Sequence, residues 1–284
     1  LQDTLTAFKV LLIVGFVAVG VTAAEPPRAL AGERPWLEAT FSPDFAVALI
    51  YVTFSYSGWN AATYVAGEVR RPARTLPLAL VAGTALVTVL YLALNFVFLA
   101  GAPAEALRGE IEVGHVAAVH LLGRSSGFVL STIIALGLVS TVGALVLTGA
   151  RVLEAMGRDH GPLALLARRA TGGGPIVAAS VQGALALLLV STASFDVLLG
   201  YIGVTLSFFA AATVLGVFVL RRRAPELDRP YRTWGYPLTP FAFVGLMIWV
   251  MVHACVEKPV VALAGGGTLA LGFALWALVR RRGE

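Results

Sequence analysis

The chain has 284 residues, of which 58% are hydrophobic and 13% are charged, with a net charge of +5. Soluble proteins carry about 25% charged residues, and one soluble core of this size could not bury so much apolar surface. Intrinsic disorder is excluded because disordered chains have low hydrophobicity. A single cysteine, Cys255, excludes an internal disulfide and a paired-cysteine metal or redox site. The composition therefore predicts an integral membrane protein.

Apolar stretches long enough to cross a bilayer, about 20 residues each, recur along the whole chain. Eight spans are predicted within one membrane domain, residues 1–284: residues 5–24, 45–67, 77–100, 127–150, 176–193, 197–220, 238–256 and 260–279. Backbone groups in hydrocarbon must be satisfied within their own segment, so an all-α fold is expected. Residues 113–122, in a loop, are expected to form a helix on the outer surface.

The first span begins close to Leu1, and the opening lacks the basic segment and cleavage site of a signal peptide. We therefore expect the sequence to be the interior of a longer protein.

Lys9 is the only Lys or Arg inside any predicted span. A charge at the centre of a membrane helix costs about 2.5–3.5 kcal/mol. Either the stem of Lys9 carries its ammonium to the cytoplasmic interface, or a buried Lys9 bridges helices and exchanges a proton.

The middle of the second span is polar: residues 54–60 read Phe-Ser-Tyr-Ser-Gly-Trp-Asn. Glycine and asparagine are poor helix formers, and serine competes for backbone hydrogen bonds. Such an interruption at mid-depth is costly unless it lines a cavity, and transporters use broken helices to bind the charged ends of a substrate. The alternative is a packing notch whose hydroxyls bond back to the helix.

The fourth span carries adjacent hydroxyls, Ser140 and Thr141, which either bond their own helix or offer oxygens to an ammonium or a cation.

At the start of the fourth span, residues 123–127 match the G-x-S-x-G pattern of nucleophilic hydrolases. That pattern requires a strand–turn–helix context, whereas here it opens a membrane helix. The spans contain neither paired aspartates nor a metal-binding cluster. The sequence therefore predicts no enzyme, no catalytic residue, no metal and no cofactor.

The basic residues indicate the orientation of the chain. Of 21 Lys and Arg residues, 15 lie in alternate loops and at the C-terminal end, in residues 70–74, 151–169, 221–232 and 280–282, and 5 lie in the opposite loops. This bias places the first set in the cytoplasm and predicts a multi-pass protein of the cell membrane with both chain ends cytoplasmic. Because the arginines are spread over separate loops, nucleic-acid binding is not predicted.

Four segments, in order, resemble amino acid permeases of the amino acid–polyamine–organocation family. Residues 6–9 (Thr-Ala-Phe-Lys) resemble the start of the family's helix five, and residues 54–60 and 67–77 (Gly-Glu-Val-Arg-Arg-Pro-Ala-Arg-Thr-Leu-Pro) resemble its helix six to seven region. Residues 150–159, with Pro162, resemble the inner end of helix eight, and residues 220–237 resemble the loop after helix ten.

The resemblance implies that the eight spans are helices five to twelve of a twelve-helix, inverted-repeat (LeuT-like) transporter. It implies secondary active transport of amino acids by alternating access, in the lipid bilayer, with an oligomeric state that the sequence leaves open. The alternative is a truncated, non-transporting fragment or partner subunit of such a permease, because the family's helices one to four are not in this chain.

The resemblance also implies roles for individual residues. Lys9 matches a lysine that stands in for a sodium ion, with Ser140 and Thr141 facing it from helix eight; a protonatable Lys9 suits proton symport or sodium-free exchange. Phe54 matches an aromatic gate over the substrate, and Asn60 is a polar lining residue. The unwound backbone of Ser55, Tyr56, Ser57 and Gly58 is expected to hold the substrate's ammonium, with helix-end dipoles for its carboxylate.

Overall fold

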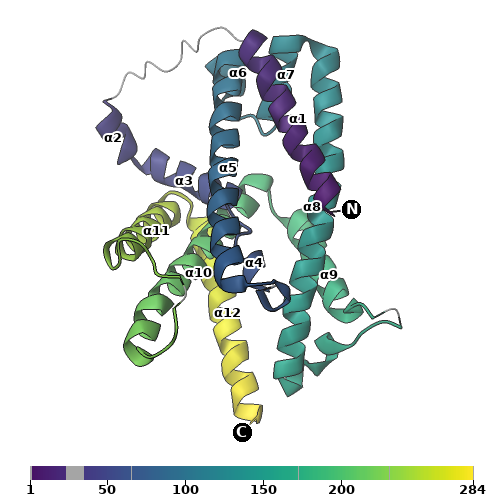
Figure 1. Ribbon diagram of the computed structural model, residues 1–284. Helices are drawn as coiled ribbons and strands as arrows, with labels where there is room; N and C mark the ends of the chain where they lie inside the picture. Colours follow the sequence, from purple (N-terminus) through teal and green to yellow (C-terminus); the bar gives the residue numbers. More distant parts are fainter. Residues whose placement is uncertain (1, 24–34, 65, 172, 230, 284) are drawn as a thin grey trace. The chain divides into compact units, whose positions relative to one another are not determined.

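The computed structural model describes residues 2–23, 35–64, 66–171, 173–229 and 231–283. In these ranges every regular element is an α-helix or a short 3-10 helix (Figure 1). The elements are α1 (Gln2–Ala23), α2 (Trp36–Thr40), α3 (Pro43–Ser55), α4 (Ala61–Tyr64), η2 (Ala66–Glu68), α5 (Pro72–Gly101), α6 (Ala104–Leu107), α7 (Val113–Leu122), α8 (Arg124–Asp159), η3 (Gly161–Ala167), α9 (Ile176–Thr192), α10 (Phe195–Arg223), α11 (Leu238–Glu257) and α12 (Pro259–Gly283).

Six helices in the described ranges are long and apolar enough to cross a membrane: α1, α5, α8, α10, α11 and α12. The predicted second and fifth spans correspond to the shorter apolar helices α3, with 13 residues, and α9, with 17 residues. Helix α3 is short because it stops inside the polar segment at Ser55. A helix, α7, forms at the residues expected in the loop before the fourth span.

The chain divides into two compact units, and α5 and α8 contribute residues to both. The first unit comprises residues 1–34 and 81–147. Within it, α1 packs against α7 (Figure 1) and meets α8 through the hydrogen bond from Lys9 to Thr141. The ring centroids of Phe16 on α1 and Phe98 on α5 are 6.2 Å apart. Helix α1 also meets α5 where Gly20 faces Val97, a residue with no exposed surface. This packing holds the N-terminal helix, and with it Lys9, against its neighbours.

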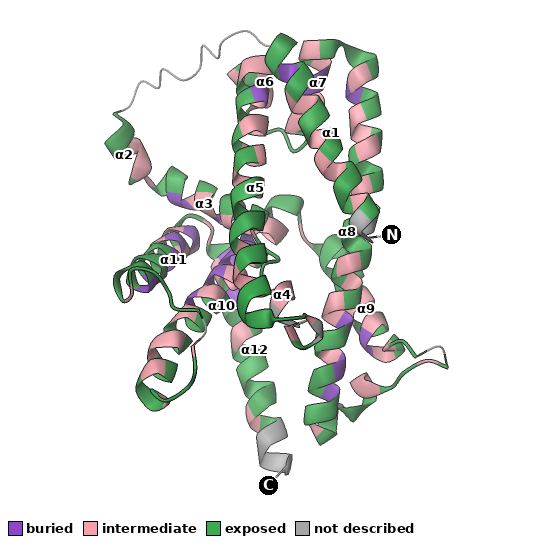
Figure 2. Ribbon diagram, in the orientation of Figure 1, coloured by how far each residue is buried: buried purple, intermediate pink, exposed green. Residues whose placement is uncertain are grey.

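The second unit comprises residues 35–80 and 148–284, and its core lies where α3, α10, α11 and α12 meet (Figure 2). The core residues are Ile50, Val204, Val250, Ala254 and Val261, all of them buried. Helices α3 and α10 approach closely at Gly203, where an added Cβ would lie 2.2 Å from Cγ2 of Ile50. Only a residue without a side chain permits this approach, which sets the separation of the two helices.

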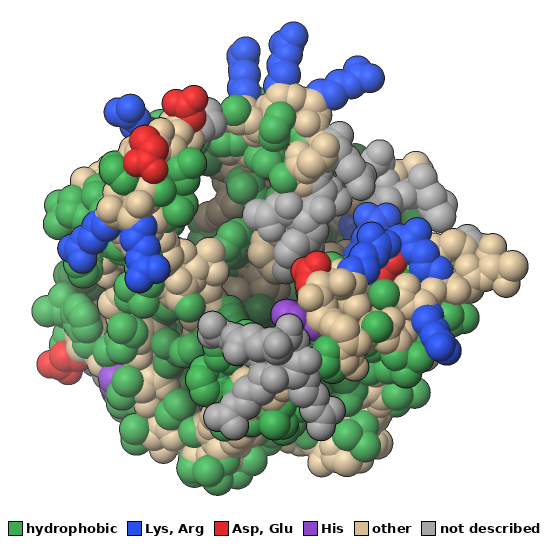
Figure 3. Space-filling view, turned by 90° about the horizontal axis from the view of Figure 1, so that it is seen from below, with side chains coloured by type: hydrophobic (Ala, Val, Ile, Leu, Met, Phe, Trp, Pro, Cys, Tyr) green, Lys and Arg blue, Asp and Glu red, His purple; other side chains and the backbone are tan. Residues whose placement is uncertain are grey.

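Large apolar side chains cover much of the outer surface of the helices. Phe128 on α8 is 72% exposed, and Leu263 on α12 is 77% exposed. Soluble monomers rarely expose apolar patches larger than a few hundred Å², so such helices are suited to contact with acyl chains. On the face that Figure 3 shows, Lys and Arg side chains project at separate places with hydrophobic side chains between them.

The C-terminal end of α8 is tied to the segment that follows it through one buried carboxylate. Glu154 is only 4% exposed, and its Oε1 accepts hydrogen bonds from Arg158 and Arg169, each at 2.6 Å. The hydrogen bond to Glu154 raises the pKa of Arg169 above its ordinary value. Beside them, η3 packs on Gly157, where an added Cβ would lie 2.7 Å from the backbone nitrogen of Ala167. One buried acid thus anchors two arginines that the sequence assigns to a cytoplasmic loop.

The close approach of α3 and α10 generates a stability prediction. Gly203→Ala is expected to destabilise the protein by about 1–3 kcal/mol, because its methyl group collides with Ile50. The matched control is Gly216→Ala on the same helix, where an added Cβ meets no atom within 4 Å. Thermal melting of the detergent-solubilised protein measures both variants. Equal melting temperatures for the two would contradict the packing described.

The Glu154 cluster generates a second stability prediction. Glu154→Gln is expected to lower the melting temperature, since a neutral amide replaces the charge that faces Arg158 and Arg169. Asp159→Asn removes the same charge from an exposed position at the end of the same helix and serves as the control. The expectation fails if the two substitutions change the melting temperature by the same amount.

Candidate functional site

The predicted interruption around Tyr56 is present in the structure. Helix α3 begins at an N-cap, where the hydroxyl of Ser42 accepts a hydrogen bond from the Phe45 N–H, and it ends at Ser55. Residues 56–60 form turns, and a helix resumes only at Ala61. Gly58 has a φ of +99°, a left-handed conformation that favours glycine. The helical ladder therefore breaks at the glycine that the sequence places in its middle.

The break changes how the backbone groups are used. The Ser57 N–H donates to the Phe54 carbonyl, and the Ala61 N–H donates to the Gly58 carbonyl, both at 3.0 Å and both three residues back instead of four. In the described part of the chain, no backbone carbonyl accepts a hydrogen bond from the N–H of Gly58 or Trp59. These N–H groups are therefore not used by helical hydrogen bonds, and main-chain groups of this kind can bind a polar ligand.

A cavity of about 510 Å³ adjoins the break. It is lined by Thr53, Ser57, Gly58, Trp59 and Asn60 from the α3–α4 segment, and by Leu206, Phe209, Ala210 and Thr213 from α10. The α3–α4 side offers hydroxyl, amide and backbone groups, whereas the α10 side is mainly apolar. This division suits a small molecule with a charged end and an apolar end.

The structure places the predicted substrate-binding residues in two groups. Ser57, Gly58 and Asn60 line the cavity. Phe54, Ser55 and Tyr56 are not among its lining residues; Ser55 instead donates its hydroxyl to the Tyr51 carbonyl at 2.9 Å. The difference arises because α3 stays helical through Ser55, so consecutive residues there project from different faces of the helix.

Thr53 and the α10 residues were not predicted as lining residues. Thr53 lies four residues before Ser57, and that spacing would have put both on one helical face. No comparable signal marks Leu206, Phe209, Ala210 and Thr213, because they are about 150 positions away in the sequence and face the break only through tertiary packing.

Within the first unit, Lys9 contacts the residue that was predicted to face it. Its Nζ donates to the Thr141 hydroxyl at 2.9 Å, and Thr141 also lies 3.3 Å from the Gly137 carbonyl of its own helix. An added Cβ at Gly137 would lie 3.6 Å from Cε of Lys9, so the lysine stem passes over that glycine. Lys9 is half-buried and bridges α1 and α8. The side chain of Ser140, also predicted at this position, lies outside the described residues.

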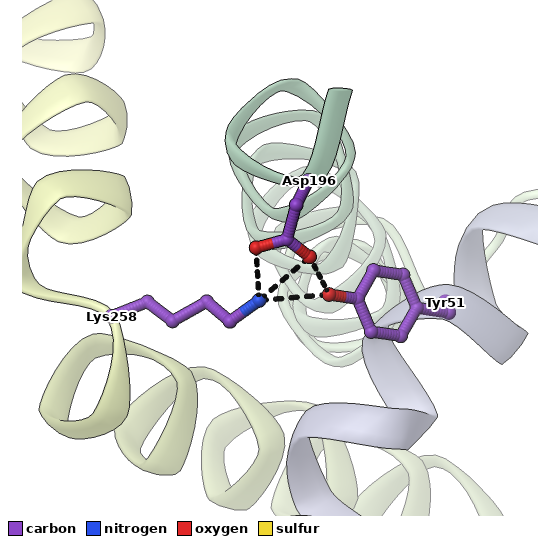
Figure 4. A network of polar contacts seen from close by, with 3 residues as sticks. All are labelled: Tyr51, Asp196 and Lys258. Atoms are coloured by element: carbon purple, nitrogen blue, oxygen red, sulfur yellow. Dashed lines mark hydrogen bonds and ion pairs between the residues drawn. The ribbon is translucent and has the colours of Figure 1, made fainter. Parts of the chain in front are cut away.

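A third polar cluster, in the second unit, was not predicted. Figure 4 shows that the Lys258 ammonium lies between Asp196 and Tyr51, which come from α10 and α3. Its Nζ lies 2.7 Å from Oδ2 and 2.9 Å from Oδ1 of Asp196, and 2.8 Å from the Tyr51 hydroxyl, which also donates to Asp196. From the sequence, Lys258 is expected only as one of the five charges in the loops opposite the arginine-rich set, because three residues so far apart carry no common motif.

The partners of Lys258 control its protonation. Burial lowers the pKa of Lys258, but the hydrogen bonds from its ammonium to Asp196 and Tyr51 outweigh this effect and raise the pKa above its ordinary value. Lys258 therefore stays charged at physiological pH. Among the described residues, no three His, Cys, Asp or Glu side chains lie close enough to hold a metal ion.

The backbone of the break generates a prediction. Gly58→Ala is expected to destabilise the protein by about 1–2 kcal/mol, because a Cβ is strained at positive φ even though the space beside Gly58 is open. Gly67→Ala, where the space is also open and φ lies outside the left-handed region, is the control. Melting in detergent distinguishes them, and an Ala at position 58 that melts with the control would argue against the left-handed turn.

Comparison with known proteins places these features in a family. Residues 1–276 match the family model described as Amino acid permease. The "Large neutral amino acids transporter small subunit 2" of Oryctolagus cuniculus is 26% identical over 98% of this chain and 52% of its own length. The "b(0,+)-type amino acid transporter 1" of Oryctolagus cuniculus is 27% identical over 81% of this chain and 48% of its own. The "Asc-type amino acid transporter 1" of Mus musculus is 27% identical over 92% of this chain and 49% of its own length.

The chain thus spans about half the length of the curated relatives that it matches. These relatives are transporters and not enzymes, in agreement with the class indicated by the sequence. The family match extends over nearly every residue of the chain and confirms the resemblance found in residues 6–9, 54–77, 150–159 and 220–237. The chain therefore belongs to the amino acid permease family, and with its long apolar helices it is part of a multi-pass membrane protein.

Proposed function

We propose that this chain carries part of the substrate pathway of a secondary amino acid transporter that works by alternating access. The observation that carries the proposal is the helix break at residues 56–60 beside a cavity of about 510 Å³. An apolar helix loses hydrogen bonds at such a break, and a zwitterionic substrate can replace them. The names of the relatives, all amino acid transporters, support the same substrate class.

The two sides of the cavity are suited to the two ends of an amino acid. Carbonyl groups of the unwound segment, from Ser55 to Gly58, receive the ammonium, and the N–H groups of Gly58 and Trp59 attract the carboxylate. Leu206, Phe209 and Ala210 on α10 supply apolar contacts for the substrate's side chain. Phe54, on the final turn of α3, is assigned the role of a gate over the substrate, and Tyr56, the first residue after the helix, belongs to the unwound segment.

Lys9 is assigned the coupling function. Its ammonium is bound by the Thr141 hydroxyl at 2.9 Å and joins α1 to α8 within the first unit. Through this charge-assisted hydrogen bond, a change at Lys9 on α1 is transmitted directly to α8. Ser140, the residue before Thr141 in the sequence, is kept as a second candidate from the resemblance alone. This arrangement suits proton symport or sodium-free exchange.

The proposed topology has eight spans of a LeuT-like fold, with α3–α4 and α9 completing the six long helices. The excess of arginine in alternate loops supports a cytoplasmic location for both ends of the chain in the plasma membrane. The break then lies near the middle of the bilayer, where a substrate is reached from one side at a time.

The test is uptake of a panel of labelled amino acids, leucine first, into liposomes that contain the full-length protein. Gly58→Leu is expected to reduce uptake by about tenfold to hundredfold, because the bulky residue displaces the groups that hold the substrate. Lys9→Ala is expected to abolish accumulation driven by a proton gradient or by exchange, since it removes the only charge inside the predicted spans.

Gly83→Leu, the same substitution at an exposed glycine of α5 with open space beside it, is the matched control and should keep normal uptake. Unchanged uptake in both Gly58→Leu and Lys9→Ala would remove the site assignment. Absence of uptake by the unaltered protein for every amino acid of the panel would remove the transport function itself.

A further inference from the structure

We propose that Asp196 and Lys258 are positioning residues that act through Tyr51 to hold the end of α3, and with it the break, in register with α10. This inference rests on the proposed function and extends it: a cluster that does not line the cavity is inferred to contribute to the affinity for the substrate. The cluster joins three places far apart in the sequence: α3, the start of α10, and the junction of α11 and α12 (Figure 4).

The cavity depends on the register of α3 against α10, since one wall comes from each. The apolar contact between these helices, Ile50 against Gly203, sets their separation at one point, and because the hydrophobic effect is non-directional it constrains the turn of one helix against the other less closely than hydrogen bonds do. A directional contact adds to the constraint on the register, and charge-assisted hydrogen bonds provide one.

Tyr51 makes that directional contact. Its phenol bonds both Asp196 and Lys258, and Asp196 holds Lys258 through both carboxylate oxygens, at 2.7 and 2.9 Å. Three partners in mutual contact define the position of the Tyr51 ring more closely than one hydrogen bond would. Tyr51 follows Ile50 directly, so the polar cluster and the apolar core act on the same turn of α3.

The constraint on Tyr51 is transmitted to the break over a short distance. The Ser55 hydroxyl donates to the Tyr51 carbonyl at 2.9 Å, which links the last residue of α3 to the constrained turn. Thr53, a lining residue of the cavity, lies between the two. On the other side, Lys258 is connected to the core through Val261, which is buried against Gly200 of α10. The cluster thus fixes α3 relative to α10, α11 and α12 together.

The experiment measures transport kinetics of the full-length protein in liposomes with labelled leucine, or with the amino acid of the panel that the unaltered protein takes up fastest. Lys258→Met and Asp196→Asn are each expected to raise KM by about threefold to tenfold, the effect of losing a charge-assisted hydrogen bond at a partly exposed site, with Vmax within about twofold. A loss of folded protein would instead lower Vmax and leave KM unchanged.

Four further variants make the result specific. The double variant Asp196→Asn with Lys258→Met is expected to raise KM no further than either single change, because the two residues act as a unit. The exchanged pair Asp196→Lys with Lys258→Asp is expected to recover part of the lost affinity. Glu257→Gln, an exposed charge next to Lys258, is the control and should leave KM unchanged. If Asp196→Asn yields little folded protein, Tyr51→Phe, which removes one hydroxyl, carries the same expectation.

The outcomes separate this inference from the proposed function. If Gly58→Leu abolishes uptake while the Lys258, Asp196 and Tyr51 variants keep the normal KM, the positioning role is wrong and the substrate site stands. If these variants lower Vmax and melting temperature together at constant KM, the cluster is structural only, and the inference is overturned. If the unaltered protein takes up no amino acid of the panel, both fail.

Discussion

Backbone amide groups in apolar surroundings must be hydrogen-bonded, and this requirement explains both the helices of the chain and the importance of the place where the helical bonding of α3 stops. Helix α3 satisfies its own amide groups up to Ser55, and in residues 56–60 the backbone does so only in part, with the Ser57 and Ala61 N–H groups bonded three residues back instead of four. In an apolar environment such groups require a polar partner, and the cavity beside them provides room for one. The break is thus a cost to the fold that a bound ligand can offset.

Helix α10 is the main neighbour of the break and forms the opposite wall of the cavity. Its glycine at position 203 brings α3 close, its middle residues form the apolar wall of the cavity, and its first turn carries Asp196. An acidic residue in the first turn of a helix is favoured by the helix dipole, so Asp196 has two reasons to remain charged there, the dipole and Lys258. One helix therefore sets the distance to α3, lines the cavity and carries the acid that binds Lys258 and Tyr51.

The two lysines described here differ in the partners that they bind. Lys258 binds a carboxylate and a phenol, a combination that keeps it protonated and suits a fixed structural contact. In the described residues Lys9 donates instead to a hydroxyl, Thr141, whose attraction for the lysine is weaker than that of a carboxylate. A lysine held by a neutral oxygen is better suited to a contact that forms and breaks, which is what the coupling role proposed for Lys9 would require.

The amino acid composition indicated the class of the protein, a glycine in a polar run indicated where the helix breaks, and the family resemblance implied that Thr141 faces Lys9; each of these can be recognised without knowledge of the packing. The residues that line the cavity beside the break, and the meeting of Tyr51, Asp196 and Lys258, follow from the tertiary structure alone. Phe54 and Ser55 lie outside the lining because α3 stays helical through Ser55, so that consecutive residues there project from different faces, and Tyr56, which follows the helix, is not a lining residue either. The α10 wall and the lysine cluster join residues some 150 to 200 positions apart, and the packing of Ile50 on Gly203 that brings α3 and α10 together leaves no local pattern to read.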